Sequence, residues 1–205
     1  FCIGREKDEP ELYRVGGEAQ DSNWQIRVVP NKFPFAPIHE IIIHSPDHHK
    51  NFEELPEDQV ELIFQTYRQR YNTHKTKGQV YIFHNRGEGG GESLPHPHTQ
   101  FSVIPNEVKL DISQLKPDSL SLKREETEKI ETPYFLISSP IASQWPDEVW
   151  IYPKKGDCTF GDISDEEILD LSSIVSRLIQ ILDLRHCHEF SINFFKGIKE
   201  FAGAI

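Results

Sequence analysis

The chain has 205 residues, of which 37% are hydrophobic and 11% aromatic, enough to build a packed core. Its 33 acidic residues outnumber its 22 basic residues, and the net charge of -11 disfavours a nucleic-acid binder that relies on a general positive field. No apolar run reaches the roughly 18 to 20 residues that span a bilayer, and three cysteines are too few for a disulfide framework. We therefore expect a cytoplasmic protein without a membrane or nucleic-acid partner.

The first half of the chain predicts extended segments around one helix. Residues 24–35 predict a strand that ends at two prolines, and residues 39–44 predict a second strand. In residues 57–72 the apolar side chains recur at helical spacing, at Val60, Ile63, Phe64 and Tyr67. Residues 79–84 then predict a returning strand.

The second half predicts the same order of elements after a charged connector. Residues 111–132 are charged and poor in aromatic residues, which predicts a solvated connector or an exposed helix. A strand is predicted at residues 148–152. Ser164 and Glu167 have the spacing of a capping box, and a helix with an apolar stripe follows, at Ile168, Leu171, Ile174, Val175, Leu178, Ile179 and Leu182. Residues 189–195 predict the last strand.

The two halves also match as an internal repeat. The segments that begin at His39 and Asp147 superpose at one constant offset of 108 residues, which aligns Phe52 with Phe160 and Val60 with Ile168. We therefore predict an α+β fold of two half-domains from an internal duplication, with a largely antiparallel sheet and helices packed on one face. We predict that residues 1–110 form the catalytic half, that residues 111–132 form the connector, and that residues 133–205 form the degenerate half.

The strongest candidate site follows the third predicted strand. Four glycines in residues 87–91 suit a loop whose backbone N–H groups converge on an anion such as a phosphate. The sequence His96-Pro97-His98-Thr99-Gln100 comes next. Residues two apart in a strand share a face, so His96, His98 and Gln100 are expected to line one wall beside the glycine loop, with His98 exposed.

These residue types favour phosphorus chemistry. A neutral imidazole is a good nucleophile near pH 7 and needs no strong base to activate it. The second histidine either holds the nucleophile in place or ligates a metal, and the amide of Gln100 donates to a phosphoryl oxygen without adding charge. An edge strand with exposed polar residues remains the structural alternative.

His-Pro-His-x-Gln resembles the motif of the galactose-1-phosphate uridylyltransferase family, a nucleotidyltransferase branch of the histidine-triad superfamily. Residues 29–34, 45–50 and 85–100 resemble further segments of that family. The resemblance implies that His98 takes a nucleoside monophosphate from a nucleotide sugar and passes it to a hexose 1-phosphate, with Gln100 holding the phosphoryl oxygens. It also implies a homodimer and a set of substrate-binding residues, namely Asn31 and Phe33 at the nucleoside, Asn85 and Ser93 at the phosphates, and Arg86.

The resemblance further implies a structural zinc ion. Its family ligands correspond to Cys2, His48 and His96 in this sequence, which is one ligand short of a closed tetrahedral site. His49 is next to His48, and only one of these adjacent histidines is expected to ligate.

Two other functions remain open. A phosphorylase that acts on ADP-glucose or a dinucleoside polyphosphate would use the same His98 and Gln100, with inorganic phosphate as acceptor. A catalytically silent nucleotide-binding or zinc-binding module would keep the scaffold and would not be labelled on His98 by a nucleotide sugar.

Overall fold

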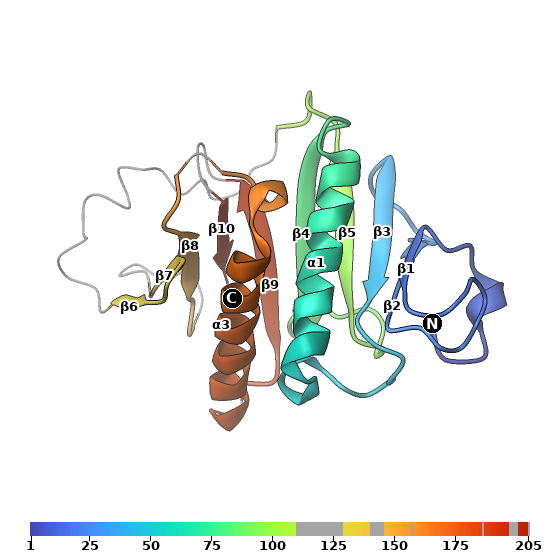
Figure 1. Cartoon of the computed structure of the whole chain (residues 1–205), viewed down its shortest axis with the longest axis horizontal. Helices are drawn as coiled ribbons and strands as arrows, with labels where there is room; N and C mark the ends of the chain where they lie inside the picture. The colour runs from blue at the N-terminus through green and yellow to red at the C-terminus, as the bar shows by residue number, and fades with distance from the viewer. Residues whose placement is uncertain (110–128, 140–145, 157, 186, 197–200, 205) are drawn as a thin grey trace.

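The computed structural model describes one continuous mixed α+β architecture (Figure 1). It describes the chain with the exception of residues 110–128, 140–145, 157, 186, 197–200 and 205. The strands form a single ten-stranded sheet in the order β1-β2-β3-β5-β4-β9-β10-β8-β7-β6, and every pair of neighbours is antiparallel. The predicted α+β class with a largely antiparallel sheet is confirmed.

The strands are short, as is usual for an antiparallel sheet. They are β1 (Tyr13–Val15), β2 (Ile26–Pro30), β3 (Ile38–Ile43), β4 (Gln79–Arg86), β5 (His98–Ile104), β6 (Lys129–Glu131), β7 (Phe135–Ser138), β8 (Trp150–Pro153), β9 (Phe190–Lys196) and β10 (Phe201–Ala204). The helices are α1 (Glu57–His74) and α3 (Asp165–Leu184), and the 3-10 turns are η1 (Glu6–Asp8), η2 (Phe52–Glu54) and η3 (Phe160–Asp162).

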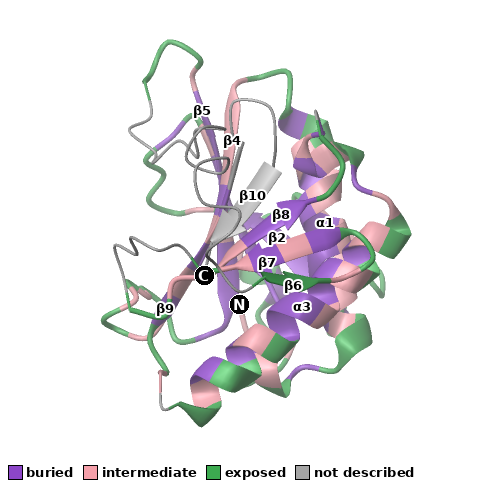
Figure 2. Ribbon diagram, turned by 90° about the vertical axis from the view of Figure 1, so that its left-hand side faces the viewer, coloured by how far each residue is buried: buried purple, intermediate pink, exposed green. Residues whose placement is uncertain are grey.

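Helices α1 and α3 pack against the same face of the sheet, and their buried residues lie on the side that faces the sheet (Figure 2). The apolar residues predicted for both helices join one core cluster with residues from η2, η3 and the strands beneath. The Ser164–Glu167 capping box is present at the start of α3: the Ser164 hydroxyl accepts from the Glu167 amide, and the Glu167 carboxylate accepts from the Ser164 amide. Within the described residues, neither helix is long and apolar enough to cross a membrane.

The same order of elements occurs twice along the chain. Strand, 3-10 turn, helix and strand follow one another in β3-η2-α1-β4 and again in β8-η3-α3-β9, and both the turns and the helices begin 108 residues apart. An origin by duplication stays a prediction. The halves do not form separate sheets, because β4 pairs directly with β9.

The predicted connector falls largely outside the described residues. Its last part, Lys129–Glu131, forms the edge strand β6 and pairs with β7. The extended pattern that predicts a single strand over residues 24–35 is shortened to β2, which ends at Pro30, although the Asn31 N–H still donates to the His39 carbonyl.

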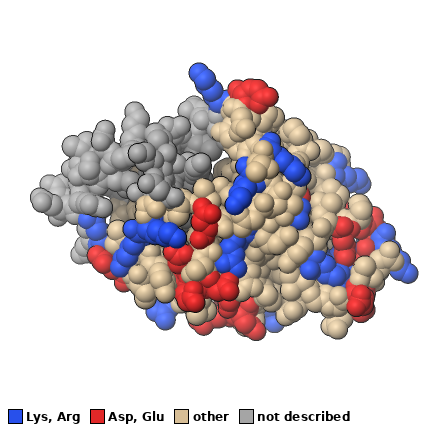
Figure 3. Space-filling model, turned by 45° about the horizontal axis from the view of Figure 1, so that its top comes forward, with Lys and Arg blue, Asp and Glu red and all other residues tan. Residues whose placement is uncertain are grey.

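The charges of the surface are mixed in sign. On the face drawn in Figure 3, the basic side chains of the described residues are interspersed with acidic ones.

Candidate active site

The candidate site lies on the face of the sheet that the helices leave uncovered. Side chains alternate along β5, so Thr99 and Phe101 face the helices, whereas His98 and Gln100 face the other way. The predicted shared face of His98 and Gln100 is therefore observed. His96 precedes the strand, and its side chain turns toward Ser45 and His48 instead of continuing the row.

His98 is held in one tautomer by the backbone. Its Nδ1–H donates to the carbonyl oxygen of His96 at 2.9 Å, which leaves the lone pair on Nε2. The side chain is only 4% exposed, so the expectation of an exposed imidazole is wrong. Burial lowers the pKa of His98, and the ring is therefore neutral near pH 7.

Gln100 is anchored by a histidine that the motif did not reveal. His39 on β3 places Nε2 2.9 Å from Gln100 Oε1 and 3.1 Å from Asn31 Nδ2. Burial lowers the pKa of His39, which keeps its ring neutral. The alternation of β3 pointed to this face, but the register that pairs Ile41 with Gln100 is not readable from sequence.

A cavity of about 700 Å³ opens over His39 and Gln100, and its lining includes His96 but not His98. This volume is ordinary for a small-molecule site. Phe33, whose side chain is 81% exposed, stands at its rim. The structure thus brings several predicted site residues to one lining, namely Asn31, Phe33, Ser93, His96 and Gln100, and adds His39, which was not predicted.

Two predicted substrate-binding residues, Asn85 and Arg86, also lie outside this lining. Asn85 is on the open face of β4, where its Oδ1 accepts from Ser191 and its Nδ2 donates to the Gly91 carbonyl. Arg86 is one residue further and therefore faces the helix side. It is paired there with Glu53 and lies over the Phe190 ring, so the structure does not bring Arg86 to the cavity.

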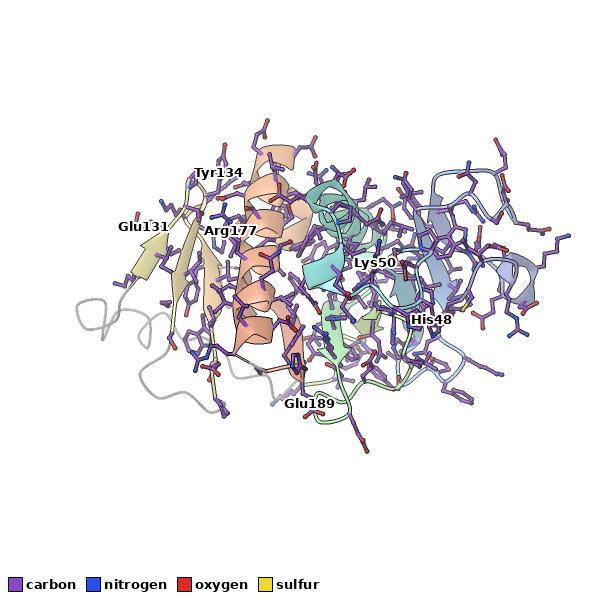
Figure 4. All side chains as sticks on the ribbon, turned by 90° about the horizontal axis from the view of Figure 1, so that it is seen from below. His48, Lys50, Glu131, Tyr134, Arg177 and Glu189 are labelled. Carbon is purple, nitrogen blue, oxygen red and sulfur yellow. The ribbon has the colours of Figure 1, made fainter. Side chains whose placement is uncertain are left out.

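The glycine-rich loop uses its amides within the protein. Gly87 N–H donates to Glu92 Oε2 at 2.8 Å and Gly89 N–H donates to Glu189 Oε1 at 3.1 Å. Gly91 N–H donates to the Glu88 carbonyl. Figure 4 shows Glu189 next to this loop. The interpretation of the loop as a phosphate nest is therefore wrong for these amides, which are already bonded to protein oxygens.

The loop needs glycine for a different reason, namely its close approach to β9. A Cβ atom at Gly87 would lie 2.6 Å from Glu189 Cγ, and one at Gly90 would lie 2.7 Å from the Phe190 carbonyl oxygen. Gly87 and Gly91 also adopt positive φ angles of 74° and 82°. The chain after β4 therefore packs directly on the first residues of β9.

A candidate metal site adjoins the cavity. Cys2 Sγ lies 3.2 Å from His48 Nδ1 and 3.9 Å from His96 Nδ1, and the two nitrogens are 3.1 Å apart. Ligands of one tetrahedral zinc ion would be separated by about 3.3 to 3.6 Å, given bond lengths of about 2.0 to 2.3 Å. His96 Nε2–H donates to the Ser45 carbonyl, which turns the Nδ1 lone pair toward Cys2 and His48. The three residues therefore fit one metal ion, and among the described residues they form such a group together.

The chain is similar in sequence to known proteins. A model of the galactose-1-phosphate uridyl transferase N-terminal domain matches residues 36–103, the stretch that carries His39, His98 and Gln100. An ADP-glucose phosphorylase of Arabidopsis thaliana is 27% identical over 88% of this chain and 61% of its own length. A galactose-1-phosphate uridylyltransferase of Haemophilus influenzae is 34% identical over 67% of this chain and 44% of its own length.

The fold matches a solved structure over the whole chain. The crystal structure of an ADP-glucose phosphorylase from Arabidopsis thaliana with bound ADP-glucose superposes with a TM-score of 0.84 at 22% identity, and the match covers 100% of this chain and 79% of that one. The predicted resemblance to the galactose-1-phosphate uridylyltransferase family is thereby confirmed. The chain spans 61% of the length of the first of these relatives and 44% of the second.

Proposed function

We propose that the protein is a nucleotidyltransferase that moves a nucleoside monophosphate from a nucleotide sugar to a hexose 1-phosphate through a covalent intermediate on His98. The observation that carries the proposal is the fixed tautomer of His98. Its Nδ1 is committed to the His96 carbonyl, so Nε2 is left with a lone pair, and it makes no hydrogen bond among the described residues. The family of the relatives supports the same reaction class.

In the first half of the reaction, the Nε2 lone pair attacks the α-phosphorus of the nucleotide sugar. The Nε2–P bond forms, the bond from phosphorus to the bridging oxygen breaks, and the sugar 1-phosphate leaves with that electron pair. The ring then carries a positive charge, which the His96 carbonyl stabilises through Nδ1–H. In the second half, an oxygen of the acceptor phosphate attacks phosphorus, the Nε2–P bond breaks, and neutral His98 is restored.

Gln100 and the cavity position the nucleotide in this scheme. His39 holds Oε1 of Gln100, so the amide nitrogen is free to donate to the phosphoryl oxygens. Asn31 and Phe33 are proposed to bind the nucleoside, and Asn85 and Ser93 the phosphates. The aromatic side chains of Phe33 and Phe35 lie at the same opening, where a base can stack.

A zinc ion held by Cys2, His48 and His96 is proposed as a structural cofactor. It would supply no reaction chemistry and would tie the N-terminal segment to the chain that leads into β5. Because His96 also accepts the hydrogen bond from His98, fixing His96 fixes the nucleophile.

A second candidate is a phosphorylase that releases a nucleoside diphosphate by using inorganic phosphate as the acceptor. It is favoured by the ADP-glucose phosphorylase relative, whose alignment covers more of this chain than that of the Haemophilus influenzae uridylyltransferase. The first half-reaction at His98 is the same in both candidates. Only the base of the donor and the acceptor differ.

The assembly and location of the enzyme are also proposals. We propose a cytoplasmic homodimer in which residues 1–110 carry the nucleophile and residues 133–205 support it. The pairing of β4 with β9 supports this assignment, because it joins the two parts of the chain in one sheet. Light scattering of the purified protein would test the dimer.

The decisive experiment is intact mass spectrometry after separate incubation with UDP-glucose and ADP-glucose. We expect one nucleotidyl adduct on the wild-type protein with the preferred donor and none on His98→Gln. The matched control is His188→Gln, which changes an exposed histidine of the other half. Release of the adduct by hexose 1-phosphate identifies a transferase, and release by inorganic phosphate identifies a phosphorylase. Absence of any adduct on the wild type would indicate a catalytically silent module.

A further inference from the structure

Polar side chains of β9 lie on the open face of the sheet, although β9 belongs to the second half of the chain. The register pairs Asn85 with Ser191 and Phe83 with Asn193. The β4–β5 ladder ends at the Phe83–Gln100 pair, and Asn85 and His98 each lie two residues beyond that pair, on the open face of their strands. Ser191 and Asn193 therefore lie next to β4, the strand that separates β9 from the strand of His98.

These side chains form a hydrogen-bonded chain with a defined direction. The Tyr81 hydroxyl donates to Asn193 Oδ1 at 2.6 Å, and Asn193 Nδ2 donates to Ser191 Oγ at 3.1 Å. Ser191 Oγ then donates to Asn85 Oδ1 at 2.8 Å. Burial raises the pKa of Tyr81, so the phenol keeps its proton.

The direction of these hydrogen bonds determines which end of the Asn85 side-chain amide remains available to a ligand. Because Ser191 occupies Oδ1, the donor nitrogen Nδ2 points the other way, where one hydrogen meets the Gly91 carbonyl at 3.3 Å. The second hydrogen is left for a ligand, since an amide nitrogen carries two donors. With the amide reversed, Asn85 would present a carbonyl oxygen to that ligand and would repel a phosphate.

We propose that Ser191 is a positioning residue for the transfer reaction, acting with Asn193 and Tyr81 behind it. It holds the Asn85 amide with its donors toward the phosphates of the nucleotide sugar. This inference rests on the proposed function of His98. It means that a residue of the second half, Ser191, orients a substrate-binding residue of the first half, Asn85.

The test starts with Ser191→Ala, which removes the donor to Asn85 Oδ1. We expect the donor KM to rise roughly tenfold, the cost of one misdirected amide contact, with little change in the rate of adduct formation at saturation. Ser191→Thr keeps the hydroxyl and is expected to restore the KM. The matched control is Ser102→Ala on the same face, because the Ser102 hydroxyl donates to the Tyr81 carbonyl and not to Asn85.

Coupling to Asn85 distinguishes positioning from a general structural effect. In an Asn85→Ala background, Ser191→Ala is expected to raise the donor KM no further, because its target is gone. Tyr81→Phe is expected to have a smaller effect than Ser191→Ala, since it acts at the far end of the chain. Additive effects of Ser191→Ala and Asn85→Ala would overturn the proposal.

A readout without substrate keeps this inference separate from the proposed function. The side-chain amide resonances of Asn85 in the nitrogen-proton NMR spectrum are expected to shift in Ser191→Ala, to recover in Ser191→Thr and to stay in place in Ser102→Ala. If the wild type forms no adduct but these shifts occur, the proposed function fails and the placement of Asn85 by Ser191 stands. Unchanged Asn85 resonances in Ser191→Ala would overturn the inference.

Discussion

His39 Nε2 lies 2.9 Å from Gln100 Oε1, across two paired strands, and this contact determines which end of the Gln100 amide meets the cavity. Because a neutral His39 can donate to Oε1, the amide nitrogen of Gln100 stays available as a donor. The two side chains therefore act as one unit, although 61 residues separate them in sequence.

The first prediction concerns the amide of Gln100. Gln100→Ala is expected to slow adduct formation by roughly 10²-fold, the effect of losing one donor to a phosphoryl oxygen. Gln100→His is expected to raise hydrolysis of the donor relative to transfer, because histidine exchanges protons near neutral pH. The measurement is the ratio of free nucleoside monophosphate to transferred product at a fixed acceptor concentration. If neither variant changes the ratio or the adduct rate, Gln100 is only a wall of the cavity.

The second prediction concerns His39. His39→Ala is expected to slow adduct formation by roughly tenfold, because the Gln100 amide loses its anchor. In a Gln100→Ala background the same substitution is expected to have little effect on the adduct rate. Equal effects of His39→Ala in both backgrounds would show that His39 acts without Gln100.

The third prediction concerns the close packing of the glycine loop on β9. Gly90→Ala places a Cβ atom 2.7 Å from the Phe190 carbonyl oxygen and still closer to that of Arg86, so the loop must shift. A shift of about 1 Å near the reacting groups can cost roughly 10²-fold in rate, and we expect a loss of adduct formation of that order. Glu88→Ala changes an exposed residue of the same loop and serves as the control. Full activity of Gly90→Ala would show that the positions of Ser93 and Asn85 at the substrate do not depend on the close packing of this loop.

The fourth prediction concerns the metal. Cys2→Ser is expected to lose bound zinc, whereas Cys187→Ser keeps it, because Cys2 and not Cys187 belongs to the group with His48 and His96. At free zinc near 100 times its Kd, bound metal contributes about 2.7 kcal/mol to the free energy of unfolding. Metal analysis and unfolding with and without a chelator measure both effects. A wild-type protein that is free of metal and unaffected by chelation would refute the zinc site.

Sequence periodicity predicted the fold and part of the site. Spacings of 3.6 and 2 residues can be read from short stretches of sequence. They predict the apolar stripes of the helices, the returning strands and the shared face of His98 and Gln100. The same alternation sends Arg86 to the helix side, one residue after Asn85, so a motif match alone misplaced it. The bond from His39 to Gln100 and the chain through Ser191 depend on strand register, which is set by long-range packing. The glycine loop was misinterpreted because glycine suits a close backbone approach as well as an anion nest.

The last prediction concerns pH and a buried histidine on the helix side of β4, next to β5. His84 is completely enclosed and donates from Nδ1 to the His98 carbonyl, and burial lowers its pKa to about 4. An unfolded histidine has a pKa of about 6.5, so between pH 6.5 and pH 4 the unfolded state binds more protons than the folded state. The free energy of unfolding therefore falls as the pH falls through this window, by up to about 3 kcal/mol from His84 alone, and the loss levels off below pH 4.

The measurement for this prediction is urea unfolding of wild type and His84→Gln at pH 7.5, 6 and 5. His84→Gln is less stable at pH 7.5, because the core loses a ring packed beside His44 and Phe52, but its stability is expected to fall less between pH 7.5 and pH 5. Protonation of the candidate zinc ligands affects both proteins equally, so the difference between them reports His84 together with its electrostatic effect on the neighbouring His44. His188→Gln is the control and is expected to follow the wild-type curve. Parallel curves for wild type and His84→Gln would show that His84 does not contribute to the acid sensitivity of the fold.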